Sequence, residues 1–380
     1  MTFSVNTKAL AGLPPFLDRR DRDLSAAATY VVANTKLHDG AGLANIFGVH
    51  ERVIADITAF LHGTASAYAL ADAARIRAAI TAYQQADARA AVRADAAAPG
   101  VPAGLPQTPP ITAAERGLGP SLFDDRVTPT GALLPPGNHY PDMPYQPSWF
   151  DALSPTSVAR DAIWKLSRLA ADVGILDRPY DPFEMLVEPF VGDWAGLLRC
   201  ADVFSNVGIM LTASGTGVLD ARGAVALVWT GNVAGMAAIN LASFASTVSS
   251  GTSPLDAIAT AYREVSYGVQ DNANLIEMVI TTLIDDVFDG ALDLATFGLF
   301  DIYDTGVKIR NFAKTLMAAI RIAGNVVDLV SAGFAASNDA VNRLGMLRHA
   351  PSMPGVPFPV PPIPWPVPLN TKPRVPVPHP

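Results

Sequence analysis

The strongest constraint on the fold is a long stripe of apolar residues with the spacing of one helix face. The stripe contains Leu255, Ile258, Tyr262, Val265, Val269, Ile276, Val279, Leu283 and Val287. Ser253 is a suitable N-cap, and Pro254 suits the first helical position. A helix of about 35 residues would be about 50 Å long at 1.5 Å per residue. Such a rod is common in long helical hairpins and rare in compact enzymes.

Residues 1–94 are predicted to form a first helical hairpin. A seven-residue repeat, typical of an antiparallel coiled-coil seam, contains Leu10, Leu17, Leu24 and Val31. After Gly40 and Gly42, a second stripe continues to about Gln85 and contains Val53, Ile57, Phe60, Thr64, Ala67, Ala71 and Ala74. Two helices joined by a short glycine-containing connection are expected to pack antiparallel.

Residues 152–345 carry further helical stripes. One amphipathic helix is predicted over 157–173, and two more stripes run over 190–212 and 232–250. We expect Gly215, Gly217 and Gly223 to loosen the chain between these two stripes. Residues 291–345 are apolar, glycine-spaced and helical in pattern. The sequence therefore predicts an all-α fold with a second, longer helical-hairpin domain over 152–345.

Prolines separate these two domains. Residues 95–151 contain twelve of the chain's 32 prolines, which exclude a long helix or a central strand there. We predict a linker whose aromatic end, with His139, Tyr140 and Trp149, packs on the second domain. Residues 346–380 form a Pro-rich tail, and its composition favours polyproline II or disorder.

Composition narrows the class of protein. Half of the residues are hydrophobic and only 16% are charged, which is unusually apolar for a soluble protein. The net charge is −8, and no basic run follows an aromatic pattern, so nucleic acid is not a predicted partner. Residues 223–255 carry no charge and are long enough to cross a bilayer. Because many Ser, Thr and Asn residues interrupt them, we favour a buried hairpin and keep a membrane span as the alternative.

No catalytic, cofactor or metal site is predicted. The sequence lacks a phosphate-binding loop, a nucleophile elbow and a Rossmann glycine fingerprint. Its six histidines are scattered, and none has the spacing of a metal motif. Cys200 lies among apolar residues and is interpreted as a small buried hydrophobe. The first twenty residues lack the pattern of a Sec signal peptide.

Two short patterns remain. Trp229-x-Gly231 lies between two helical stripes, where a bulky indole and a glycine allow a helical hairpin to reverse. Tyr83-x-x-x-Asp87 lies at the end of the first hairpin, and its spacing places both side chains on one helix face. Each pattern is weak alone, since similar ones occur at Trp194-x-Gly196, Tyr68/Asp72, Tyr180/Glu184 and Tyr267/Asp271.

Together, these patterns resemble substrates of actinobacterial type VII (ESX) secretion systems. The stretch from SVNTKALAGLPPFLDRR to AAITAYQQAD resembles ESX secretion-associated targets, in which a helical hairpin ends in a Y-x-x-x-D/E export signal. The stretch around VWTGNVAGMAAINLASF resembles Trp-X-Gly hairpin domains, which stand at the front of secreted polymorphic toxins. The resemblance implies that Tyr83 and Asp87 form the export signal on an accessible helix end. It also implies that Trp229 and Gly231 form the hairpin turn.

One departure from that pattern shapes the functional prediction. Such toxins carry an enzymatic domain after the helical stretch, whereas this sequence continues into a Pro-rich tail. We therefore predict a non-enzymatic, Sec-independent exported protein, secreted or in the cell envelope. Its predicted partners are the type VII machinery and a helical protein or a second copy of itself. The alternatives are a membrane-active protein that inserts 223–255 and 291–335, and a targeting carrier for a separately encoded toxin.

Overall fold

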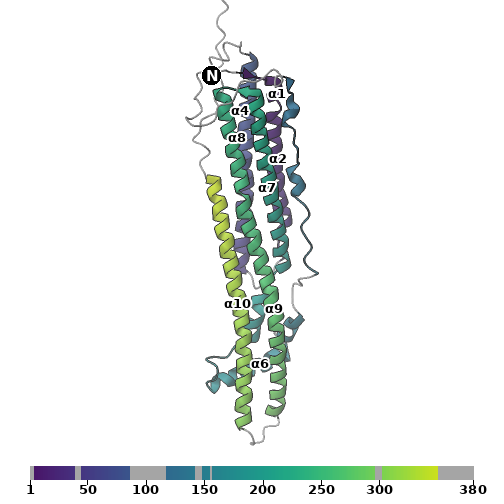
Figure 1. Cartoon of the computed structure of the whole chain (residues 1–380). Helices are drawn as coiled ribbons and strands as arrows, with labels where there is room; N and C mark the ends of the chain where they lie inside the picture. The colour runs from purple at the N-terminus through teal and green to yellow at the C-terminus, as the bar shows by residue number, and fades with distance from the viewer. Residues whose placement is uncertain are drawn as a thin grey trace, which may run out of the picture.

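The computed structural model describes residues 4–38, 44–85, 117–141, 148–154, 156–295 and 302–349. They form an elongated all-α bundle, which confirms the predicted fold class (Figure 1). The main helices are α1 (Thr7–Leu10), α2 (Leu13–Asn34), α3 (Ala44–Ala59), α4 (Ala67–Gln85), α6 (Val158–Asp172), α7 (Trp194–Val228), α8 (Asn232–Ser250), α9 (Thr252–Ala295) and α10 (Ile302–His349). The strands β1 (Ser4–Val5) and β2 (Trp229–Thr230) form the one sheet of the described residues.

The N-terminal helices pack antiparallel, and the predicted seam of α2 is buried. Leu10, Leu17, Leu24 and Val31 are all fully buried. The second predicted stripe is correct only as far as Phe60, because Ala71 and Ala74 are exposed and Ala69, Ala73 and Ile76 are buried instead. Between α3 and α4 the chain forms a π-helix, η2 (Phe60–Ser66). Hydrogen bonds from i to i+5 use more residues per turn, so the apolar stripe changes phase there.

The longest helices exceed their predicted lengths. α7 runs through 35 residues without a break at Gly215, Gly217 or Gly223, contrary to the expected loosening. Gly215 instead allows a close helix crossing, since a Cβ there would overlap the Ser249 hydroxyl on α8. α9 begins at Thr252 and extends over 44 residues to Ala295. α10, with 48 residues, returns antiparallel along α9.

Part of the Pro-rich segment lies along the bundle. Residues 117–141, here called the strap, contain two short 3₁₀ turns, η4 (Pro120–Phe123) and η5 (Pro129–Ala132). After the strap come η6 (Ser148–Leu153), α6, η7 (Phe183–Val187) and η8 (Glu188–Phe190). Trp149 of η6 packs edge-on against Phe190, with ring centroids 5.4 Å apart. The strap descends beside α2 and α7 (Figure 1).

A single hydrophobic core joins helices from both predicted hairpins. It contains Leu17 of α2, Ile76 of α4, Phe204 of α7 and Leu316 of α10. The segments 86–116 and 350–380, which include most of the predicted tail, lie outside the described residues. Tyr83 and Trp229, one from each predicted hairpin, thus belong to the same hydrophobic core.

Candidate functional site

The connection between α7 and α8 contains both residues of the Trp-x-Gly pattern. α7 ends at Val228, Trp229 and Thr230 form β2, and α8 begins at Asn232. Gly231 has φ +119°, a conformation that is readily available only to glycine. Trp229 is completely buried. The second pattern of this kind, Trp194-x-Gly196, lies in the first turn of α7.

The N-terminal strand covers this connection. β1 pairs antiparallel with β2, so that Ser4 lies opposite Thr230 and Val5 opposite Trp229. The Asn6 backbone N–H donates a hydrogen bond of 2.7 Å to the Val228 carbonyl oxygen. These bonds satisfy backbone groups at the turn, which would otherwise be left without partners. The start of the chain thus contributes directly to the environment of Trp229.

Tyr83 meets Trp229 at the same end of the bundle. Tyr83 lies in the last turn of α4, and its ring stands edge-on to the indole, with centroids 5.9 Å apart and planes 78° apart. Edge-to-face packing is a favoured arrangement of aromatic rings. The ring is only 7% exposed, so the aromatic face predicted to lie on an accessible helix end is packed inside the bundle. Asp87, the second predicted signal residue, lies outside the described residues.

The other Tyr-x-x-x-acid pairs have different surroundings. Tyr68 stacks on Phe244 of α8 at a centroid distance of 5.9 Å. Its partner Asp72 is buried, and this burial raises the pKa of the Asp72 carboxyl to about 6, although Arg75 opposes the shift. Tyr267 on α9 is 54% exposed. Only Tyr83 therefore joins the Trp-x-Gly turn in the part of the chain that the structure describes.

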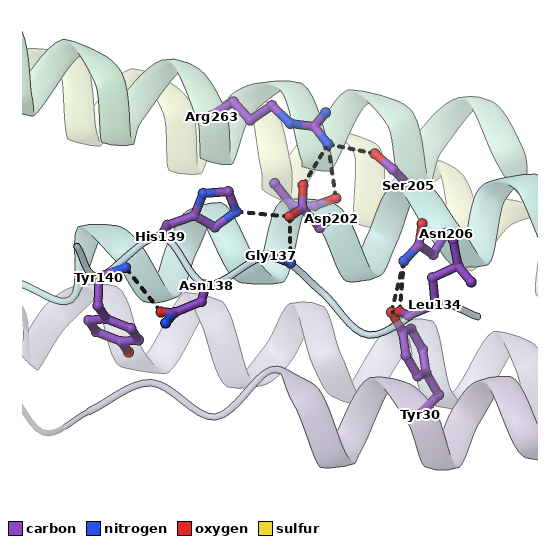
Figure 2. A network of polar contacts seen from close by, with 11 residues as sticks. Tyr30, Leu134, Gly137, Asn138, His139, Tyr140, Asp202, Ser205, Asn206 and Arg263 are labelled. Atoms are coloured by element: carbon purple, nitrogen blue, oxygen red, sulfur yellow. Dashed lines mark hydrogen bonds and ion pairs between the residues drawn. The ribbon is translucent and has the colours of Figure 1, made fainter. Parts of the chain in front are cut away.

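A polar network that the sequence did not reveal holds the strap on the helices (Figure 2). The Asp202 carboxylate on α7 accepts hydrogen bonds from His139 Nε2 at 2.9 Å and the Gly137 N–H at 3.2 Å. Arg263 of α9 donates to the same carboxylate at 3.4 Å and to Ser205 at 3.0 Å. Burial alone would raise the pKa of Asp202, but the hydrogen bonds from the strap bring it below its ordinary value.

A second set of strap contacts lies on either side of Asp202. The Tyr30 hydroxyl and the Asn206 amide both donate to the Leu134 carbonyl oxygen, at 2.5 and 3.1 Å (Figure 2). Asp193, the N-cap of α7, is paired with His38 Nδ1 at 3.1 Å, and the Tyr140 hydroxyl donates to the same carboxylate at 3.2 Å. Burial, followed by the nearby Asp193 charge, raises the pKa of Tyr140 to about 12.

In these contacts the Asp193 and Asp202 carboxylates hold neighbouring segments of the chain in place. The Asp193 carboxylate also accepts the Gly196 N–H at 2.8 Å, so it caps a helix while it holds His38. Cys200 is fully buried, and burial raises the pKa of its thiol far above the usual range, which disfavours the nucleophilic thiolate. Within the described ranges, no group of three or more His, Cys, Asp or Glu side chains could hold a metal ion.

A buried histidine links α3 to α9 and to the C-cap residue of α2. His50 of α3 makes contacts of 2.8 Å with the Thr35 carbonyl oxygen and 2.9 Å with the Tyr262 hydroxyl of α9. The Cys200 thiol of α7 donates to the same Thr35 oxygen at 3.5 Å. Burial lowers the pKa of His50 and favours its neutral form. We interpret this residue as a core histidine with both ring nitrogens engaged.

Comparison with known proteins adds no identity, since no family model, curated protein or solved structure matches this chain.

Proposed function

We propose that this chain is an exported substrate of a type VII secretion system, with a non-enzymatic role in partner binding or envelope assembly. The observation that supports the proposal is the contact between Tyr83 and Trp229. The sequence resemblance selects these residues for separate reasons, one from each hairpin, and they are 146 positions apart in the chain (229 − 83). Their contact brings the two sequence patterns together at one end of the bundle.

The proposed site is this end of the bundle, rather than the Tyr83 ring alone. Export without a cleavable signal requires that the machinery read a folded surface. The buried Tyr83 and Trp229 rings fix the positions of the α4 end, the α7–α8 turn and β1 relative to one another. Asp87, four residues beyond Tyr83, then supplies the charged group that the machinery reads. The aromatic pair has a positioning role, and the carboxylate has a contact role.

Secretion assays in the native host test this division. Tyr83→Ala and Asp87→Ala are expected to abolish export, with the protein retained in the cell lysate at its normal level. Because Tyr83→Ala also removes core packing, Tyr83→Phe separates the two effects: it keeps the edge-on contact and should still be exported. Tyr267→Ala is the matched control, since Tyr267 has the same spacing to Asp271 and is exposed. Normal secretion of both the Tyr83→Ala and Asp87→Ala variants would contradict the proposal.

A membrane-active role is the second candidate, and one observation favours it. Helical segments over Gly48–Gln85, Asn232–Val287 and Gly306–Leu347 are long and apolar enough to cross a bilayer. In the most apolar window of Gly306–Leu347, only 28% of the residues are buried inside the bundle. Under this proposal, micromolar protein releases dye from liposomes, and deletion of 291–335 prevents release. An absence of leakage across a range of pH would eliminate it.

A further inference from the structure

A groove lies between the strap and α7, and the proposed function does not use it. It has a volume of about 390 Å³, and we call it the strap groove. Ligand clefts in proteins span roughly 300–1,000 Å³, so this groove has room for a few side chains and not for a folded domain. Its lining includes Phe16, Phe123, Val127, Gly217, Gly223 and Leu227.

The hollow exists because α7 presents small residues towards the strap. A Cβ added at Gly223 would meet no atom within 4 Å, so the space beside it is open. A Cβ at Gly217 would already meet Phe16 and Arg20 at ordinary or slightly short distances, which marks the floor of the groove. Val127 and Leu227 on the rim are 68% and 39% exposed. The groove is thus an apolar surface with aromatic side chains in its floor.

The rim of the groove carries unpaired carboxylates. Asp125 is already engaged by Arg19 at 2.6 Å and Arg20 at 2.8 Å. Asp124 and Asp220 line the groove too, are exposed, and form no ion pair with any described residue. Arg126 is the one basic side chain in the lining. The free charge at the rim is therefore two carboxylates against one guanidinium, which favours a basic occupant.

The chain itself contains a segment of matching chemistry. Residues 350–380 contain Lys372 and Arg374 but no Asp or Glu, and their apolar residues alternate with proline around Trp365. Proline-rich segments bind apolar grooves lined with aromatic side chains. Trp365 is 16 residues beyond His349, the end of α10 (365 − 349). At up to about 3.3 Å per residue, this length spans about 53 Å, which is about the full length of the 35-residue helix α7 that lines the groove.

We propose that the strap groove binds the Pro-rich segment around Trp365 of the same chain. Apolar and proline side chains fill the hollow beside Gly223, and the basic residues that follow lie near Asp124 and Asp220. This intramolecular contact connects the end of α10 to the strap, on opposite sides of the bundle in the view of Figure 1. It is independent of the proposed export signal, since the groove contains neither Tyr83 nor Trp229.

Disulfide trapping in the full-length chain tests the contact. The natural Cys200 is fully buried, so introduced cysteines dominate the reaction. Val127→Cys combined with Val367→Cys should oxidise to an intramolecular disulfide at least about tenfold faster than Leu134→Cys with Val367→Cys, because docking raises the effective concentration of the pair. Leu134 is a matched control: it is on the same strap and 60% exposed, but does not line the groove.

Two further variants show whether the groove itself is responsible. Gly223→Met should fill the hollow, because nothing lies within 4 Å of its Cβ position, and should lower the trapping rate to that of the Leu134→Cys control. Asp124→Asn with Asp220→Asn should slow trapping most at low salt. Equal rates for the Val127→Cys and Leu134→Cys pairs, or no effect of Gly223→Met, would overturn the proposal. Disulfide-linked dimers in place of the intramolecular product would overturn the assignment to the same chain.

Discussion

The two ends of the bundle differ in how some of their apolar residues are packed. At the turn end, where α2, α4, α7 and α8 lie together, Trp229 packs against Tyr83 of α4 and its indole is completely buried. At the far end, α9 and α10 extend beyond α7 as an antiparallel pair, and Leu275 and Met278 of α9 are 50% and 66% exposed. An apolar residue contributes to stability in proportion to the surface that its neighbours remove from water. Truncating the buried Trp229 should therefore cost more stability than truncating an exposed apolar residue of the far end.

The largest effect is expected for the aromatic centre of the turn end. Trp229→Ala should lower the free energy of unfolding by about 3–5 kcal/mol, since it leaves a cavity in a packed core. Trp164→Ala is the matched control, because that indole is 39% exposed on α6 and its loss should cost less. Urea unfolding followed by circular dichroism measures both variants. Equal losses would show that the two ends do not differ as described.

A smaller effect is expected at the crossing of α7 and α8. Gly215→Ala should cost about 1–3 kcal/mol, since the added Cβ overlaps the Ser249 hydroxyl and lies 3.1 Å from the Ala245 carbonyl oxygen. Gly223→Ala in the same helix should instead stabilise by up to about 1 kcal/mol, because Ala favours helix and the site is open. Thermal unfolding of both variants shows directly whether each substitution stabilises or destabilises the protein. A stabilising Gly215→Ala would contradict the close crossing.

The pH dependence of stability should contain a contribution from Asp72 of α4. The pKa of Asp72 is raised to about 6 in the folded protein, above its unfolded value. The folded state therefore binds the proton more tightly, and this contribution to stability is lost as pH rises from about 4 through 6. A shift of about two units corresponds to roughly 2–3 kcal/mol, as an upper bound. Asp72→Asn should flatten the pH profile of the urea midpoint over this window, and an unchanged profile would exclude the assignment.

The smallest effect is expected on the exposed side of the far end. Met278→Gln should change the unfolding free energy by less than about 0.5 kcal/mol, as surface substitutions usually do. The measurement is the same urea titration, at two protein concentrations a hundredfold apart. A large loss that depends on protein concentration would show instead that a second copy covers this side of α9.

Local patterns predicted the helices, and the exceptions lie at a π-helical turn and at a close crossing of two helices. The seven-residue repeat through Leu17, Leu24 and Val31 identified the buried side of α2, because it depends on a period within one helix; Leu10, also buried, lies in α1. The stripe after Phe60 failed at Ala71, because the π-helical turn that shifts its phase has no simple sequence signal. The prediction that Gly215 loosens the helix was wrong. A glycine that interrupts a helix and a glycine at a close crossing of two helices look the same in the sequence.

In the candidate site, too, local features could be predicted from the sequence and long-range contacts could not. Trp229 and Gly231 were selected by their position between two stripes, and the connection of α7 to α8 lies there. The contact of Tyr83 with Trp229 could not be derived from spacing, since it joins helices far apart in the chain. The strap anchors around Asp202 were missed for the same reason: its partner His139 is 63 residues away.

The pairing of Ser4 with Thr230 also has a consequence for synthesis. These residues are 226 positions apart, so β1 emerges from the ribosome long before the strand that it pairs with. At roughly 5–20 residues per second, the interval is about 10–45 s. Until α7 and α8 have been synthesised, the apolar sides of α2 and α4 lack the surfaces that later cover them. The apolar surface of these helices is therefore exposed in the nascent chain before its cover is made, and transient exposure of this kind favours aggregation.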